Sequence, residues 1–216
     1  VGLYTYKMSS LTDSKKKNIF AFEPIKENFE QLLRHIKLFN LSNVEALNSA
    51  LDNENGKILE MVMPIKDGVP LTGHSYLTKN LSPSDNLFTG IEKNGLGYNF
   101  YRVNATTIDN FVERRKIESV QFIKIDVEGS EMNVLNGATS TLNKFKPIVQ
   151  IELVNGSKKF KQILNCFAQI EFSMFRVSNK FKLVKSDITD QKAEKNFFFI
   201  HISKINEILR LQSAGV

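Results

Sequence analysis

Residues 122–138, FIKIDVEGSEMNVLNGA, decide the fold that this sequence predicts. The stretch begins within an apolar run at 120–125, which is typical of a buried strand. Apolar residues then recur every three or four positions, which predicts a helix over 129–145. Pro147 introduces a second strand of the buried type at 148–153. Two such strands joined by a helix indicate a βαβ unit, the building block of a parallel sheet.

The same alternation of strand-like and helix-like periods extends over most of the chain. Further strands are predicted at 19–22, 44–48, 57–63, 98–103, 172–177, 181–185 and 196–202. Further helices are predicted at 25–39, 107–115 and 157–168. A chain of 216 residues is long enough for one sizeable core. We therefore expect an α/β fold in a single domain over 1–216, built on a mostly parallel sheet.

Residues 64–97 interrupt this pattern. They hold three of the five prolines and sustain no apolar period, so we expect a long irregular loop inserted in the domain. Loops of this length are usually functional or mobile, and we expect this one to lie over the site as a lid. His74 on this loop is a candidate catalytic or substrate-binding residue, with an ordinary surface residue as the alternative. His35 and His201 fall within a predicted helix and strand and are expected to be structural.

The composition restricts the classes of function. The formal net charge of +6 includes three short basic clusters, at 15–17, 114–116 and 158–159. We interpret them as solvated helix ends or loops, with contact to an anionic substrate or surface as the alternative. A nucleic-acid partner is not expected, because no basic stripe is interleaved with aromatic residues. No apolar run approaches the roughly 20 residues of a membrane-spanning helix, and the first ten residues do not resemble a signal peptide. The single cysteine, Cys166, favours a cytoplasmic location and is predicted to be a core residue rather than a nucleophile.

Acidic residues stand at or near the ends of three predicted strands: Glu23, Asp126 and Glu152. Ligands of open α/β sheets bind outside the carboxyl ends of the strands. A carboxylate there can accept hydrogen bonds from both hydroxyls of a ribose, and Glu23 fits that role. Asp126 follows a buried strand, where a charge without a partner is costly, so we expect a cofactor amine, a substrate hydroxyl or a divalent cation beside it. Glu128 and Glu131 have a simpler explanation, since carboxylates in the first turn of a helix favour its dipole.

Several stretches resemble, in order, those of FkbM-type methyltransferases. They are FIKIDVEGSEMNVLNGA (122–138), KPIVQIEL (146–153), AFEPIKENFEQLLRHIKLFNLSNVEALNSALDNENG (21–56) and NATTIDNF (104–111). The opening Val1–Thr5 is similar to the tail of the family's glycine-rich motif, whose preceding strand and Asp-x-Gly-Ala-Asn loop do not occur in this sequence. The resemblance implies a Rossmann-like class I methyltransferase fold with an antiparallel C-terminal strand, here without its first strand, and S-adenosylmethionine as the cofactor.

The resemblance also implies which residues bind the cofactor. Gly2 would line the cofactor loop beside the methionine half of S-adenosylmethionine. Glu23 would hold the ribose, and Pro24 would shape the turn next to it. The segment Asn48-Ser49-Ala50 would lie at the adenine, with Ser49 and Ala50 as contacts and Ser49 standing where many relatives carry Asp.

Asp126 would lie near the reactive methyl group, as a base, a metal ligand or a cofactor contact, although nothing in the sequence indicates a metal. The leading hypothesis is an O-methyltransferase that acts on a hydroxyl of a sugar, glycan or other small natural product. An RNA methyltransferase and a catalytically inactive binding protein of the same fold are the alternatives. A nicotinamide-dependent oxidoreductase is excluded because no Gly-x-Gly-x-x-Gly run occurs. We expect the printed chain by itself to bind S-adenosylmethionine weakly, because it lacks the first strand and half of the cofactor loop.

Overall fold

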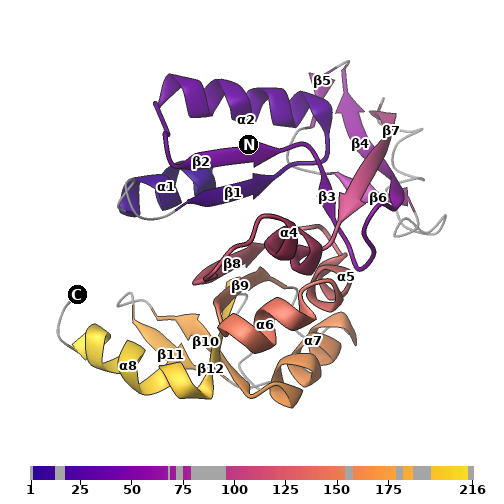
Figure 1. The fold of residues 1–216 in the computed structure, drawn as a ribbon. Helices are drawn as coiled ribbons and strands as arrows, with labels where there is room; N and C mark the ends of the chain where they lie inside the picture. The colour runs from indigo at the N-terminus through magenta and orange to yellow at the C-terminus, as the bar shows by residue number, and fades with distance from the viewer. Residues whose placement is uncertain are drawn as a thin grey trace. The chain divides into compact units, whose positions relative to one another are not determined.

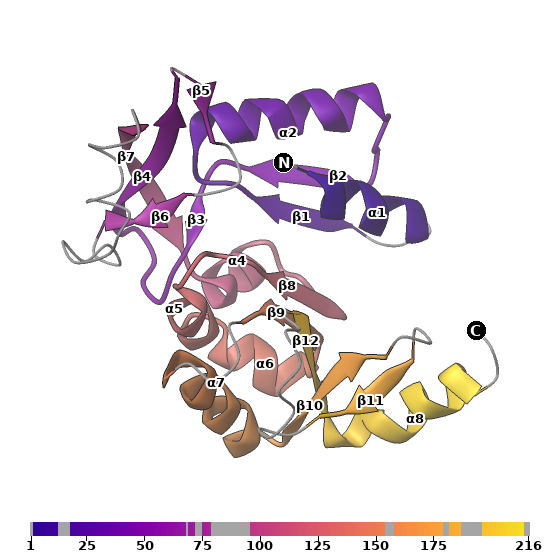
Figure 2. The same cartoon turned by 180° about the vertical axis from the view of Figure 1, so that it is seen from behind.

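The structure, a computed structural model, consists of two compact units, residues 1–107 and 108–216 (Figures 1 and 2). It describes residues 2–12, 18–67, 69–71, 75–78, 96–153, 158–178, 182–186 and 196–213. That residues 1–216 form a single domain stays a prediction.

The described part of the first unit contains two α-helices and seven strands. They are α1 (Leu3–Leu11), β1 (Ile19–Phe22), α2 (Lys26–Leu38), β2 (Val44–Leu47), β3 (Ala50–Leu51), β4 (Ile58–Lys66), β5 (Val69–Pro70), β6 (Tyr76–Leu77) and β7 (Leu96–Thr106). The unit begins with a parallel βαβ arrangement. Strands β1 and β2 pair in parallel, with α1 packed along β1 and α2 along β2 (Figure 1). The strands and helix predicted at 19–22, 25–39 and 44–48 are thereby confirmed. Helix α2 stops where expected, since Asn40 adopts a left-handed φ of 50°.

Part of the loop predicted at 64–97 is strand. Strand β4 continues to Lys66, β7 begins at Leu96, and the short strands β5 and β6 lie between them. The cause is a long antiparallel ladder between β4 and β7, in register from Ile58 opposite Asn104 to Lys66 opposite Leu96. Cross-strand pairing carries both strands past residues of low strand propensity, which a pattern within one strand does not reveal. Residues 68, 72–74 and 79–95, most of the predicted lid, lie outside the described residues, so the lid stays a prediction.

The core of the first unit connects this β4–β7 ladder to the turn after β1. Ile25 is fully buried in a cluster with apolar side chains from the neighbouring strands: Ala50, Leu59, Met61, Met63, Leu77, Val103 and Ala105. Burial of such a side chain contributes about 1.5–3 kcal/mol relative to exposure. The turn that carries Glu23 and Pro24 is therefore anchored two residues later in the core.

The second unit is a mixed five-stranded sheet with helices. Its elements are α4 (Ile108–Arg114), β8 (Phe122–Ile125), α5 (Glu131–Asn136), α6 (Thr139–Phe145), β9 (Ile148–Glu152), α7 (Lys158–Gln169), β10 (Phe172–Val177), β11 (Leu183–Lys185), β12 (Asn196–His201) and α8 (Ile202–Ser213). The strand order is β11-β10-β12-β9-β8. Strand β12 is antiparallel to both β9 and β10, so the antiparallel C-terminal strand is confirmed and β8, β9 and β10 share one direction.

The mostly parallel sheet, in contrast, is a correction. Among the described strand pairs three are parallel and six are antiparallel, and they form three sheets. The β4–β7 ladder and the C-terminal strands account for the difference, because a pattern of apolar runs predicts strands but not their direction. The chain is thus a mixed α/β protein.

The helix predicted over 129–145 is two helices, α5 and α6, separated at Gly137 and Ala138. The apolar period continues across the break, so periodicity alone predicts one helix. Helices α1 and α8 were not predicted. Helix α1 lacks an apolar stripe, and α8 has no buried residue, so neither shows the pattern of a core helix. In the described part of the chain no helix is long and apolar enough to cross a membrane.

Aromatic side chains fill the core of the second unit. Phe167 of α7 stacks on Phe199 of β12 with ring centroids 4.0 Å apart, and Phe160 contacts Phe197 edge-on at 5.3 Å. Cys166, on α7 beside them, is half-buried, and burial raises the pKa of its thiol. A raised thiol pKa lowers the reactive thiolate fraction, which supports the structural interpretation of this cysteine.

The outer edge of β11 is covered by one side chain of α8. The N–H of Leu183 donates to Oε1 of Gln212 at 2.7 Å, and Nε2 of Gln212 donates to the Leu183 carbonyl at 3.4 Å. The amide of Gln212 therefore occupies the position that a neighbouring strand would take. Free edge groups are sites of association between chains, so this contact protects the sheet edge.

Replacing Gln212 by alanine is expected to speed hydrogen exchange of the Leu183 amide by roughly three- to tenfold, the worth of one hydrogen bond. Exchange measured by NMR checks this. Ser213→Ala is the matched control, because the Ser213 hydroxyl bonds only within α8, to the Leu209 carbonyl. Equal protection of Leu183 in both variants would contradict the role of Gln212.

Candidate functional site

Glu23 lies directly after β1, where the parallel strands β1 and β2 end side by side. Its N–H donates to the Leu47 carbonyl at 3.0 Å, which joins the two strand ends. The N–H of Ile25 donates to Oε1 of Glu23 at 3.0 Å. Among the described residues Oε2 of Glu23 has no hydrogen-bond partner. One oxygen of this carboxylate is thus held by the protein, and the other is available to a ligand.

The charge on Glu23 is unfavourable in the ligand-free protein. Burial raises the pKa of its carboxyl above the ordinary 4.5, and the hydrogen bonds from Ile25 and Asn28, together with the positive charge of the N-terminus, only partly oppose this rise. Desolvation of this kind is typical of carboxylates at functional sites, where a ligand supplies the missing partners.

Two asparagines lie next to Glu23. The residue pattern assigned neither a role, and only the family resemblance includes Asn48, in the segment expected to contact the adenine. Nδ2 of Asn48 donates to the carbonyls of Glu23 and Pro24, at 3.0 Å each. Nδ2 of Asn28 lies 3.5 Å from Oε1 of Glu23. In the residue pattern, the only signal for Asn48 is its place after a strand parallel to β1, and for Asn28 its place in the first turn of α2.

Gly2 lies against α2. It adopts a left-handed φ of 83°, and a Cβ at this position would approach Cδ1 of Leu32 to 3.2 Å and Nδ1 of His35 to 3.4 Å. Both the conformation and the close approach favour glycine here. This packing gives a structural reason for Gly2, and its predicted place on the cofactor loop stays a prediction.

Ser49 and Ala50, the predicted adenine contacts, lie just after β2. The Ser49 hydroxyl is 3.1 Å from the carbonyl oxygens of both Ala50 and Asn104, so it bonds within the protein. Ala50 is 7% exposed and belongs to the core cluster around Ile25. Their contact with adenine stays a prediction.

Asp126, in the second unit, differs from what the sequence predicts. Its side chain is 43% exposed, so the expected desolvation does not occur. Its carboxylate pairs with Nζ of Lys124 at 2.6 Å. The partner of Asp126 is therefore Lys124 of this chain. The pair could have been predicted from the sequence, because side chains two positions apart in extended backbone point to the same face. Its catalytic role stays a prediction.

Two side chains of the second unit hydrogen-bond to the turn after Asp126. Glu128 and Gly129 adopt left-handed φ values of 45° and 95°. Glu131 is buried, and its Oε1 accepts from the N–H of Gly129 at 2.7 Å. Nζ of Lys159 donates to the Gly129 carbonyl at 2.8 Å. Glu131 thus has a local structural role, in agreement with the simpler explanation of this acidic cluster.

Two of the three histidines, His74 and His201, differ in what the structure shows of them. His74 lies outside the described residues, so its role stays a prediction. His201 is buried, and its Nδ1 accepts from the N–H of Ser203 at 3.1 Å. Burial lowers the pKa of His201, which favours the neutral ring. This environment agrees with the structural role expected for it. In the described ranges no group of three or more His, Cys, Asp or Glu side chains could hold a metal ion.

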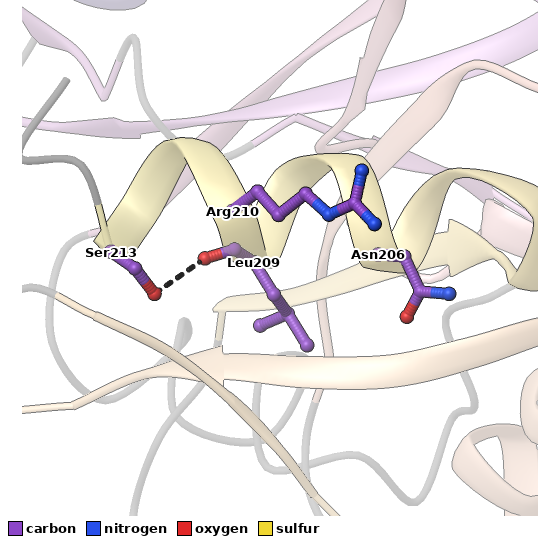
Figure 3. Close-up of a pocket in the computed structure, with 4 residues that line it drawn as sticks. All are labelled: Asn206, Leu209, Arg210 and Ser213. Atoms are coloured by element: carbon purple, nitrogen blue, oxygen red, sulfur yellow. Dashed lines mark hydrogen bonds between the residues drawn. The ribbon is translucent and has the colours of Figure 1, made fainter.

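Two surface hollows lie away from the predicted residues. One, of about 670 Å³, runs along α8 and is lined by Asn206, Leu209, Arg210 and Ser213 (Figure 3). The other, of about 290 Å³, lies on the β4–β7 ladder beside Glu60 and Arg102. Neither contains a residue that the sequence assigned to the site.

Comparison with known proteins identifies the family. The model of the methyltransferase FkbM domain matches residues 2–202, which include parts of both units. "Methyltransferase 1" of Beauveria bassiana (strain ARSEF 2860) is 27% identical over 138 residues, which are 63% of this chain and 54% of that protein. The chain therefore spans about half the length of this curated relative.

A solved structure supports the fold. The crystal structure of methyltransferase FkbM from Methylobacillus flagellatus KT matches with a TM-score of 0.52 and 15% identity, over 86% of this chain and 36% of that one. At this identity the likeness concerns the fold alone. The family model, which covers nearly the whole chain, carries the assignment: the protein belongs to the FkbM methyltransferase family.

Proposed function

We propose that this protein is an S-adenosylmethionine-dependent O-methyltransferase that acts on a hydroxyl of a sugar, glycan or other small natural product. Membership of the FkbM family supports methyl transfer. The finer statement, on cofactor and acceptor, is supported by the environment of one residue, Glu23.

The single observation that carries the proposal is the half-satisfied, desolvated carboxylate of Glu23 at the end of β1. Its Oε1 is fixed by the Ile25 N–H, and burial disfavours its charge. A ribose offers two vicinal hydroxyls, and a carboxylate at a strand end accepts both. The residues present therefore fit a nucleoside cofactor, with Glu23 holding the ribose and Pro24 shaping the turn.

The chemistry of transfer asks little of the protein. When bound, the cofactor supplies an activated methyl group on its sulfonium. The chain contributes by orienting the acceptor oxygen and by accepting its proton. Asp126, held by Lys124, and His74 are the residues we propose for these roles. Asp126→Asn removes a proton acceptor while keeping the size of the side chain, which makes it the variant to compare in activity assays.

Replacing Glu23 by glutamine is expected to weaken S-adenosylmethionine binding by about 1.5–3 kcal/mol, roughly 10- to 150-fold, because charge-assisted hydrogen bonds to the ribose are lost. Calorimetric titration of the full-length protein measures this. Glu30→Gln is the matched control, since Glu30 is an exposed carboxylate on α2 paired only with Arg34. No binding by the folded wild-type protein, or equal affinity of Glu23→Gln and wild type, would contradict the proposal.

The same variant is expected to be more stable than the wild type at neutral pH. Because the folded-state pKa of Glu23 is raised above 4.5, the unfolded chain loses its proton first as pH rises. The free energy of unfolding therefore falls as pH rises from 4.5 through the folded-state pKa. Glutamine removes this cost, so the difference in melting temperature between variant and wild type should be small at pH 4 and larger at pH 7. A variant that binds more weakly yet unfolds at higher temperature cannot owe its loss of binding to misfolding.

A further inference from the structure

Asn28 is a buried polar residue whose position packing does not explain. It lies in the first turn of α2 and is 3% exposed. Its Nδ2 faces Oε1 of Glu23 at 3.5 Å. Its Oδ1 is buried and has no hydrogen-bond partner among the described residues. A buried amide that is only half satisfied is costly, so an apolar side chain would suit this position better if packing were its only role.

The orientation of the Asn28 amide follows from its neighbour. Reversing the amide would place Oδ1 against the Glu23 carboxylate, where two acceptors would face each other without a proton between them. The amide therefore donates to Glu23. Asn28 makes this contact from α2, five residues after Glu23. The hydrogen bond favours the ionised carboxylate, whereas burial favours the protonated one.

We propose that Asn28 is a positioning residue for the cofactor-binding carboxylate: its amide fixes Oε1 of Glu23 in the ionised form and leaves Oε2 to accept from the ribose hydroxyls. The inference rests on the proposed function of Glu23. The other groups that act on this carboxylate are the Ile25 N–H, which only a proline substitution would remove, and the N-terminal amino group, whose positive charge also favours the ionised form. The neutral amide of Asn48 bonds to backbone carbonyls. The adjacent charged residues of α2, Lys26 and Glu27, are exposed, and Glu27 accepts from the Tyr101 hydroxyl at 3.1 Å. In the described part of the chain, Asn28 is thus the residue whose side chain donates a hydrogen bond to the Glu23 carboxylate.

The first test follows the carboxyl carbon of Glu23 by NMR as a function of pH in the ligand-free protein, with the signal identified by its loss in Glu23→Gln. In Asn28→Ala the titration midpoint should move to higher pH, because the donor to the charged form is removed. In Asn28→Asp, which keeps the shape of the side chain, it should move further, because a second carboxylate then lies beside the first. Gln31→Ala on the same helix is the control and should leave the midpoint unchanged. An unmoved midpoint in either folded Asn28 variant overturns the inference.

The second test measures S-adenosylmethionine affinity against pH by calorimetry. Affinity of the wild type should rise with pH until Glu23 is ionised. Asn28→Ala should reach its plateau at higher pH and bind about three- to tenfold more weakly at neutral pH. The inference is also overturned if the two affinity profiles coincide, since a merely structural residue would not move the profile. If the wild type binds no cofactor while the NMR midpoint still moves, the proposed function fails and the control of Glu23 ionisation by Asn28 stands.

Discussion

Replacing Asp109 by alanine is expected to lower the free energy of unfolding by about 2–4 kcal/mol, because its carboxylate joins two helices. Oδ2 accepts from the N–H of Ser140, and Oδ1 accepts from the N–H and the hydroxyl of Thr141, at 2.8, 2.8 and 2.6 Å. The N–H of Asp109 itself donates to the Gly137 carbonyl at 2.9 Å. Asp109 of α4 thereby caps α6, whose first residues have no local side-chain cap.

Urea unfolding followed by circular dichroism measures the effect. Asp109→Asn retains one acceptor oxygen and should lose about half as much stability as the alanine variant. Glu113→Ala, an exposed position on the same helix, should change stability by less than about 0.5 kcal/mol. A loss for Asp109→Ala no larger than for Glu113→Ala would show that the cap contributes nothing. The role also gives the motif at 104–111 a structural reason that the sequence did not reveal, since Thr141 lies 32 residues away.

Replacing Phe199 by alanine is expected to cost about 3–5 kcal/mol, the usual range for a buried phenylalanine. The side chain is 1% exposed and stacks on Phe167 with an interplanar angle of 13°. The loss combines the transfer free energy of the ring with a cavity between α7 and β12 that the sheet cannot close. Phe100→Ala is the control, because Phe100 is 71% exposed and its replacement should change the free energy of unfolding little. Thermal unfolding compares the two, and similar melting temperatures would contradict the assigned core.

The position of Glu23 could be predicted from the sequence because it depends on a local pattern. The strand at 19–22 has the predicted bounds, and Glu23 stands at its end as the strand-end rule requires. The contacts of Asn28 and Asn48 with Glu23 and Pro24 were not predicted, since they depend on how α2 and β2 pack on β1. The desolvation expected at Asp126 was wrong for the same reason, because exposure is a property of the packed structure.

The sequence by itself determined most of the strands and helices, the residues at the strand ends and the family, because these follow from the period and identity of neighbouring residues. Only the tertiary structure decided that β4 and β7 extend into 64–97 as a long antiparallel ladder. It also decided that 129–145 breaks into two helices, the second of which is capped by Asp109. The physical reason is that strand pairing, burial and non-local hydrogen bonds join residues far apart in the chain, and their energies exceed the local preferences that a sequence pattern records.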